Sequence, residues 1–350
     1  MQKVPYNGAG YLDVPVFCRY VLPCFPYAWI WGGRGIGKTY GFLEYVRYTE
    51  PLRFLLLRRT QKQIDLLRKP MFNPFKPIDA SHDNYTVCVR DGDTGAFYQG
   101  IKDGDKLVPS GPPLGYALAL STVHNVRGID LSDVDMIIFD EYCPEPHERG
   151  IRNEYEAFLN AMETIGRNRE LQGKPPVQFV GLTNANQLGN PYFLGMGVIR
   201  VVDKMIKTGR EIWTDKDRGL LLCNITGSPI STAKSKTALY RLAGSGEFAE
   251  MSLGNQFSLD YCTRQGSVPL VECRPVVAVG ELCIYQHKTN RRLWYVCDHV
   301  SGSPEKYPAD DTGLKRFRAF HSYLFNVYLD GDVVFQDILA EILFRKYFNE

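Results

Sequence analysis

Short apolar runs separated by polar turns recur through the first half of the chain. Five of them, at residues 28–31, 52–57, 116–122, 134–140 and 177–182, have the length of a single strand. Nearly continuous apolar runs of this kind are typical of strands buried on both faces of a sheet. The pattern therefore predicts a sheet of mostly buried strands in this part of the protein.

Helical periodicity appears between some of these runs. Residues 39–49 bring Phe42, Leu43 and Val46 to one side, and residues 154–165 also form an amphipathic pattern. Strands that alternate with amphipathic helices are typical of a parallel sheet with helices on both faces. We therefore predict an α/β fold, with a hairpin inserted at residues 85–98.

A basic segment follows the second apolar run. Residues 61–71 combine apolar side chains with Lys62, Arg68 and Lys69, and Lys76 lies shortly after them. Such a surface can bind DNA phosphates, but a solvated charged helix has the same pattern. Both interpretations stay open, with these four residues as the candidate DNA contacts.

The pattern changes after about residue 200. Residues 203–236 are mostly polar around one apolar run, which predicts a connecting segment. Further elements are then expected as a hairpin from 276–285 and 292–297, a loop at 301–313 and a helix at 333–348.

These changes suggest three parts. We predict an α/β domain at residues 1–205, a linker at 206–245 and a smaller α+β domain at 246–350.

One motif gives the first apolar run a chemical meaning. Residues 28–31 lead directly into Gly32-x-x-x-x-Gly37-Lys38-Thr39, the full P-loop pattern. Glycines let the backbone aim its N–H groups at phosphate oxygens, the lysine adds positive charge, and the threonine hydroxyl suits Mg²⁺. The predicted ATP-binding residues are Gly32, Gly33, Arg34, Gly35, Ile36, Gly37, Lys38, Thr39, Tyr40 and Asn184.

A second motif supplies carboxylates. The run at 134–140 ends in Asp140 and is followed by Glu141. At the carboxyl end of a buried strand, Asp140 would hold Mg²⁺ and Glu141 would deprotonate the attacking water. Upstream of the P-loop, Tyr6 and Asn7 either hold the adenine or belong to an arm packed on the domain.

Composition narrows the class of protein. The net charge of +2 excludes a bulk polycation, so any nucleic-acid surface must be local. Nine scattered cysteines without zinc spacing fit the reduced thiols of a cytosol. The sequence has neither signal-peptide features nor an apolar run of 18 residues, so we expect no membrane span.

Several sequence blocks occur together in a fixed order. They are GGRGIGKT at 32–39, FLLLRR at 54–59, IIFDE at 137–141, TIGRNRE at 164–170, LTNAN at 182–186, NPYFL at 190–194, EMSLGNQF at 250–257 and ILFRKYF at 342–348. Together they resemble the genome-packaging ATPases of small phi29-like bacteriophages, relatives of the large terminase subunits. The first and third blocks are generic to P-loop ATPases, whereas the fourth, sixth and seventh are much more specific.

The resemblance implies an ATPase that moves double-stranded DNA into an empty procapsid through the portal. It implies a homo-oligomeric ring, expected to be a pentamer, and some relatives attach through a small packaging RNA. Its expected place is the host cytoplasm, transiently on the procapsid and absent from the mature virion.

The resemblance also implies roles for single residues. By the family pattern, Lys38 and Thr39 hold phosphates and Mg²⁺, and Glu141 is the catalytic glutamate. Arg167 falls at the family's arginine finger, which acts on a neighbouring subunit's nucleotide. Arg127 falls where the family has a second basic residue facing that site.

For the fold, the resemblance implies an ASCE-type P-loop NTPase sheet followed by a degenerate ribonuclease-H-like domain. Acidic residues occur in the last hundred positions without forming a convincing cluster, so we expect no nuclease activity; they include Asp260, Asp298, Asp310 and Asp311.

Three other functions remain as alternatives. The chain could be a terminase-like ATPase with an active C-terminal nuclease, or a P-loop DNA helicase. It could also be a nucleotide-gated binding module that hydrolyses little, although the Asp140-Glu141 pair argues against that.

Overall fold

A computed structural model describes residues 3–126, 130–144, 148, 150–184, 187–225, 229–243 and 264–348. The chain forms two compact units, which are described separately. Unit 1 comprises Met1–Gly195 and Lys204–Phe257, and unit 2 comprises Met196–Asp203 and Ser258–Glu350.

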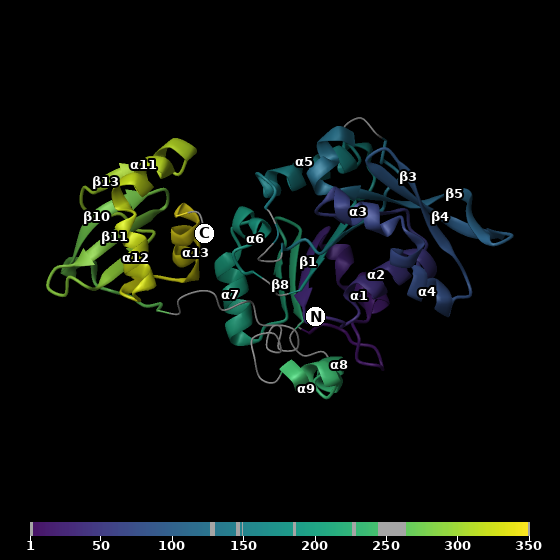
Figure 1. Cartoon of the computed structure of the whole chain (residues 1–350), viewed down its shortest axis with the longest axis horizontal. Coiled ribbons are helices and arrows are strands. Elements are labelled where there is room, and N and C mark those ends of the chain that lie inside the picture. The colour runs from purple at the N-terminus through teal and green to yellow at the C-terminus, as the bar shows by residue number, and fades with distance from the viewer. Residues whose placement is uncertain are drawn as a thin grey trace. The chain divides into compact units, whose positions relative to one another are not determined.

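Unit 1 is organised around a nine-stranded mixed sheet (Figure 1). Its strands lie in the order β3 (Thr86–Asp91), β4 (Thr94–Asp103), β5 (Lys106–Ala119), β2 (Phe54–Arg58), β6 (Met136–Asp140), β7 (Gln178–Thr183), β1 (Tyr27–Gly32), β9 (Leu220–Ile225) and β8 (Ile212–Asp215). The six strands from β5 to β9 are parallel, whereas β3, β4 and β8 pair in antiparallel fashion at the edges. The predicted α/β fold is therefore confirmed.

The helices of unit 1 lie before, between and after its strands in the sequence. They are α1 (Val14–Tyr20), α2 (Lys38–Glu44), α3 (Gln61–Leu67), α4 (Lys76–Ser81), α5 (Glu154–Gly166), α6 (Pro191–Gly195), α8 (Pro229–Lys234) and α9 (Ala238–Ala243). A π-helix at Tyr45–Thr49 extends α2, so the helix predicted at 39–49 is present. Helix α7 (Ile199–Thr208) begins in unit 2 and ends in unit 1.

Alternation along β1 separates two cores. Ala28 and Ile30 pack into a cluster with apolar side chains from α1, α2 and α3. On the other face, Trp29 packs edge-to-face against Phe158 of α5, with ring centroids 5.2 Å apart, and in a tilted arrangement against Tyr192 of α6 at 5.0 Å. Successive strand side chains point to opposite faces, so one apolar run supplies both cores.

The predicted linker at 206–245 is wrong for its first part. Strand β9 pairs in parallel with β1, and β8 pairs with β9, so both belong to the main sheet. The sequence conceals this because β8 is short and half polar, and polar residues surround β9. A second correction concerns 116–122, where β5 ends at Ala119 and a 3₁₀ helix covers Leu120–Val126.

Among the described residues, unit 2 contains a five-stranded sheet and, besides the start of α7, three helices that follow or flank its later strands. Its strands lie in the order β13 (Glu305–Tyr307), β10 (Cys273–Val279), β11 (Leu282–His287), β12 (Trp294–Cys297) and β14 (Val333–Phe335). The helices are α11 (Asp311–His321), α12 (Tyr323–Leu329) and α13 (Ile338–Tyr347). Strands β10, β11 and β12 form an antiparallel meander, and β13 and β14 add in parallel at its two edges.

Three predictions for unit 2 need correction. The segment 276–285 spans parts of two strands, because Gly280 adopts φ +52° and turns the chain. The loop predicted at 301–313 contains β13 and the first turn of α11, and the helix predicted at 333–348 begins with strand β14. Within the described residues, every helix is too short or too polar to cross a membrane.

Candidate active site

Three parallel strands deliver the site to one edge of the sheet. Strand β7 lies between β1 and β6, and all three run in the same direction. The P-loop follows β1, Glu141 follows β6, and Asn184 follows β7. Because carboxyl ends of parallel strands meet at one edge, segments separated by more than a hundred residues converge there.

The P-loop depends on glycine at three positions. Gly35 and Gly37 adopt φ of +70° and +88°, which side chains with a Cβ rarely tolerate. Gly32 has ordinary backbone angles but no space, since a Cβ there would lie 2.6 Å from Ile36 Cδ1. The motif therefore reflects backbone geometry as well as chemistry.

Lys38 is held inside this loop. Its side chain is buried, and its ammonium donates to the carbonyl oxygens of Gly32 and Gly33, each at 2.9 Å. It also lies 3.4 Å from Asn184 Oδ1, a contact between the P-loop and the end of β7. Burial lowers the pKa of Lys38 to about 7, despite the opposing effect of Asp140.

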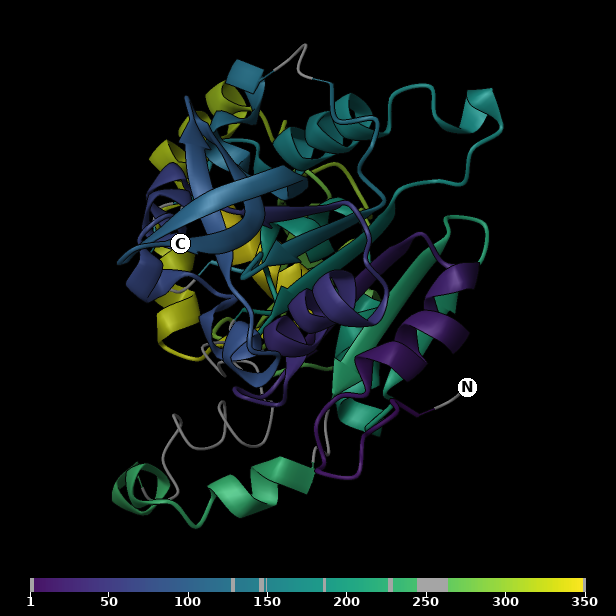
Figure 2. The same cartoon turned by 90° about the vertical axis from the view of Figure 1, so that its right-hand side faces the viewer.

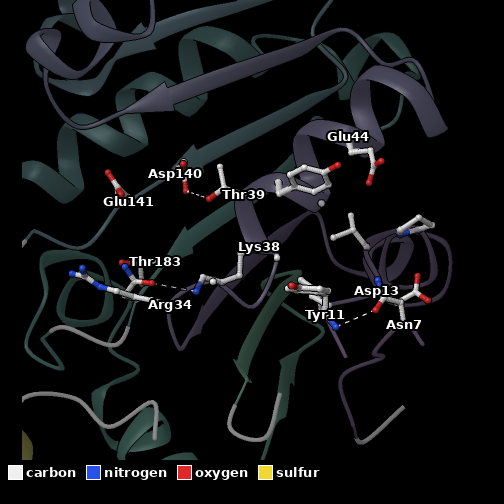
Figure 3. Close-up of a pocket in the computed structure, with 18 residues that line it drawn as sticks. Asn7, Tyr11, Asp13, Arg34, Lys38, Thr39, Glu44, Asp140, Glu141 and Thr183 are labelled. Atoms are coloured by element: carbon white, nitrogen blue, oxygen red, sulfur yellow. Dashed lines mark hydrogen bonds between the residues drawn. The ribbon is translucent and has the colours of Figure 1, made fainter. Parts of the chain in front are cut away.

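Two carboxylates face the P-loop from β6 and share one arginine. Thr39 Oγ1 donates to Asp140 Oδ1 at 2.7 Å (Figure 3). Arg58, the last residue of β2, lies 2.7 Å from Asp140 Oδ2 and 2.6 Å from Glu141 Oε2. Glu141 has φ +57°, and its side chain is 58% exposed, so it lies where a nucleotide could reach it.

These groups line a cavity of about 920 Å³. The N-terminal segment closes part of it through Asn7 and Tyr11, and a Cβ on Gly37 would lie 3.2 Å from Tyr11 Cβ. Glu44 of α2 lies on the same wall (Figure 3). Asn7 therefore lines the cavity, which is compatible with the interpretation that this segment holds the adenine. Tyr6 instead packs against the core.

The neighbour of Arg58 has a different environment. Arg59 is fully buried and donates through Nε and Nη2 to the two oxygens of Glu154, at 2.7 and 2.9 Å. Its Nη1 donates to Glu148 at 2.7 Å, and the Tyr192 hydroxyl donates to Glu154 at 2.9 Å. This network fixes the first turn of α5 to the end of β2.

The opposite end of α5 carries the predicted arginine finger. Arg167 follows the helix with φ +41°, and its side chain is 42% exposed. Its Nε donates to the carbonyl of Thr164 at 3.3 Å, and Nη1 lies 3.9 Å from Asp130 Oδ1. A side chain in this position is accessible from outside the subunit.

The structure brings most of the predicted site together. The residues lining the cavity include Arg34, Gly35, Gly37, Lys38, Thr39, Tyr40, Asp140, Glu141 and Asn184. Gly32 and Gly33 contribute carbonyls behind Lys38, and Ile36 is buried. Arg127 lies outside the described residues.

Of the candidate DNA contacts, Lys62 lies on α3, Arg68 and Lys69 directly follow it, and Lys76 begins α4; none of them lines this cavity. Lys62, Lys69 and Lys76 are exposed. Arg68 instead pairs with Asp65, and burial lowers its pKa. Three of the four residues are therefore available to a partner.

Sequence reasoning missed the role of Arg58. The doublet Arg58-Arg59 at the end of an apolar run was visible, but its meaning depends on β2 lying next to β6. A basic residue at the end of a strand beside the acidic strand is the signal that could have identified it.

Comparison with known proteins gives a family. A model described as podovirus DNA encapsidation protein (Gp16) matches residues 27–265. The DNA packaging protein of Bacillus phage phi29 is 29% identical over 233 residues, which cover 65% of this chain and 60% of that protein. The match thus spans less than two thirds of the relative.

Two solved structures share the fold. The bacteriophage Phi-29 viral genome packaging motor assembly contains a chain with 19% identity and a TM-score of 0.64, covering 96% of this chain and 99% of that one. The Phi-28 gp11 DNA packaging motor has 18% identity and a TM-score of 0.57, covering 92% and 94%.

Proposed function

The chain belongs to the family of podovirus DNA encapsidation proteins, and from this premise we propose that it hydrolyses ATP to drive double-stranded DNA into a procapsid. The observation that carries the proposal is the convergence of Lys38, Thr39, Asp140 and Glu141 on one cavity at the carboxyl edge of the sheet. Its relatives are described as a DNA packaging protein and as part of a genome packaging motor.

The nucleotide would bind with its phosphates on the P-loop. Lys38 is positioned to exchange the carbonyls of Gly32 and Gly33 for phosphate oxygens, which would restore its full charge. Asn184, 3.4 Å from the same ammonium, would contact the γ-phosphate or the attacking water. The strand order, with β7 between β1 and β6, supports an ASCE-type P-loop sheet.

Thr39 and Asp140 offer the oxygen ligands that Mg²⁺ prefers. Their side-chain oxygens lie 2.7 Å apart, so both could face one ion directly or through water. When bound, Mg²⁺ would neutralise charge on the transferred phosphoryl group. The Thr39 hydroxyl at the start of α2 and the Asp140 carboxylate at the end of β6 are the chemical groups that fit this role.

Glu141 is the proposed general base. Its carboxylate is exposed to the cavity and its strained φ sets the direction of the side chain after β6. Arg58 lies 2.6 Å from Glu141 Oε2 in a charge-assisted contact, which makes that oxygen a weaker proton acceptor until the contact opens. Arg58 is thus proposed to regulate the availability of the base.

Two arginines are proposed to act across subunits. Arg167 is presented at the end of α5, where its charge could stabilise phosphate oxygens of a neighbour's nucleotide. The same proposal applies to Arg127 on the strength of its sequence position. Both roles require a ring, for which we propose five subunits. We propose that the ring attaches to the portal, and that a packaging RNA can take part in this attachment.

DNA would be held by phosphate contacts, because a motor must move along every sequence. Lys62, Lys69 and Lys76 are the exposed candidates in the segment from α3 to α4. We expect binding to fall steeply with salt and to vary little with duplex sequence.

Unit 2 is proposed as a vestigial ribonuclease-H-like domain without nuclease activity. Two of its acidic residues have structural roles: Asp298 pairs with Arg200 at 2.7 Å, and Asp310 caps α11 by accepting from the Gly313 N–H. Asp260 lies outside the described residues. Cleavage of DNA by the full chain in the presence of divalent metal ions would contradict this proposal.

The central test is ATPase activity with and without double-stranded DNA and purified procapsids. The proposal expects hydrolysis that DNA and procapsids stimulate, and DNA that becomes nuclease-resistant inside procapsids. Lys38→Ala should remove both activities while the protein stays folded. Stimulation by single-stranded DNA alone, without any effect of procapsids, would favour a helicase instead.

A further inference from the structure

A lysine far from the P-loop in sequence contacts it in space. Helix α8 begins shortly after β9, and β9 runs parallel to β1, so the chain leaves β9 at the same edge as the P-loop. Both views show α8 next to the N-terminal segment of unit 1 (Figures 1 and 2). The last residue of α8 is Lys234.

Lys234 contacts the P-loop backbone directly. Its ammonium donates to the carbonyl oxygen of Arg34 at 2.7 Å. A Cβ built on Gly35 would lie 2.0 Å from that nitrogen, so the missing side chain of Gly35 makes room for it. Four residues earlier, on the same side of the helix, Ile230 packs against the main core.

Two lysines therefore hold three consecutive carbonyls of the loop. Lys38 takes those of Gly32 and Gly33, and Lys234 takes that of Arg34. In a trans peptide the carbonyl and the following N–H point in opposite directions. Holding the Arg34 carbonyl thus directs the N–H of Gly35 away from Lys234 and fixes the loop for anion binding.

The charges at this edge also call for an anion. Lys38, Lys234 and Arg34 lie close enough that the latter two lower the pKa of Lys38, after burial as the main cause. Asp140 is already engaged by Thr39 and by Arg58. Among the described residues, those that line the cavity include Arg34 and Gly35 but not Lys234, so its ammonium supports the loop from outside the cavity.

We propose that Lys234 is a positioning residue of the nucleotide site, which orients the P-loop through the Arg34 carbonyl, and that a bound nucleoside triphosphate, by ordering the loop, fastens α8 and α9 to it. The inference rests on the proposed function, because it requires a nucleotide on the P-loop. It adds a specific physical connection between the nucleotide and the segment that follows β9.

The test is hydrogen exchange of the backbone at residues 229–243 in the full chain, with and without ATP and Mg²⁺. Three proteins are compared: wild type, Lys234→Ala, and Lys236→Ala as the matched control, since Lys236 is an exposed lysine of the same segment. We expect ATP to slow exchange about tenfold in wild type and in the control, and less than twofold in Lys234→Ala. The Kd for ATP should rise about tenfold in Lys234→Ala, because the P-loop backbone then loses the charged hydrogen-bond donor that orients it.

The outcomes separate the inference from the function on which it rests. Identical exchange responses in Lys234→Ala and Lys236→Ala, with ATP bound by both, overturn the role of Lys234 and leave the proposed function intact. Equal protection with and without ATP has the same meaning, because the contact with Arg34 would then be purely structural. Failure of wild type to bind ATP by calorimetry overturns both.

Discussion

Arg58 and Arg59 are neighbours at the end of β2, yet their environments differ sharply. Arg59 is fully buried, and each of its three nitrogens donates to a carboxylate. Arg58 bridges Asp140 and Glu141, but its buried Nε has no partner among the described residues. A buried charge network that is fully satisfied stabilises the fold, whereas one with incomplete bonding can be rearranged. We therefore propose that Arg59 has a structural role and that Arg58 can change its partners during the reaction.

The same contrast separates the two ends of α5. Its first residue, Glu154, is 2% exposed and bound by Arg59, while Arg167 beyond its last turn is exposed and strained. The helix thus begins at a buried charge network and ends at an exposed arginine.

The largest expected effect concerns Arg167. If it acts on a neighbour's nucleotide, Arg167→Ala should lower ATPase activity by about 10³–10⁵-fold, the range for arginine fingers. Mixing it with Lys38→Ala under ring-forming conditions should restore part of the activity, because some interfaces then combine an intact site with an intact finger. Full activity of Arg167→Ala alone, or mixing without any rescue, would show that this end of α5 has no catalytic role.

Next is the base. Glu141→Gln should still bind ATP and Mg²⁺ but hydrolyse about 10²–10⁴-fold more slowly, because the amide cannot accept the proton. Glu44→Gln serves as the control, since Glu44 lines the same cavity and hydrogen-bonds His82 instead. Single-turnover hydrolysis measures both. Turnover of Glu141→Gln within about twofold of wild type means that another residue is the base.

The comparison of the two arginines is tested by stability. Arg59→Met leaves Glu154 buried without its partner, which typically costs about 3–5 kcal/mol of unfolding free energy. The double variant Arg59→Met with Glu154→Leu should recover most of the lost unfolding free energy. Replacing a whole buried ion pair by apolar residues often leaves stability unchanged. Urea unfolding provides the measurement.

Arg58→Met is the matched variant on the other face. It should destabilise the fold less than Arg59→Met and should alter ATPase activity instead. An equal loss of stability in the two variants would remove the distinction between them.

The smallest expected effect is a dependence on pH. Burial lowers the pKa of Lys38 to about 7 in the folded protein, whereas the unfolded chain has an ordinary lysine near 10.5. Between these values the unfolded state binds more protons, so stability rises with pH and is lowest, for this group, below pH 7. From pH 6.5 to 8.5 the nucleotide-free wild type should gain about 1–2 kcal/mol more than Lys38→Met. Parallel stability curves for the two proteins would mean that Lys38 is charged throughout.

Elements that depend on local sequence were predicted well. The strands β1, β2, β6 and β7 and helix α5 lie within two residues of the expected bounds, because each is a continuous apolar run or a clear amphipathic period. The P-loop and the acidic strand were likewise readable, since their chemistry is confined to short motifs.

Elements that depend on strand order were not predictable. Arg58 acquires its role because β2 lies beside β6, and Lys234 because β9 lies beside β1. Neither adjacency has a local signature. The break between β14 and α13 did have one, since Asp337 accepts from the Ala340 N–H as a helix cap usually does.

The path of the chain between the units limits how the protein can be divided. A fragment ending at residue 205 would lose β8 and β9, leaving one edge of β1 with unpaired backbone groups that invite aggregation. A fragment starting at residue 240 would lose Arg200, which bridges Asp298 and Asp337 at 2.7 Å each. Fragments cut at the boundary that the sequence suggests would thus damage both halves, and the intact chain with point substitutions is the better material for studying this protein.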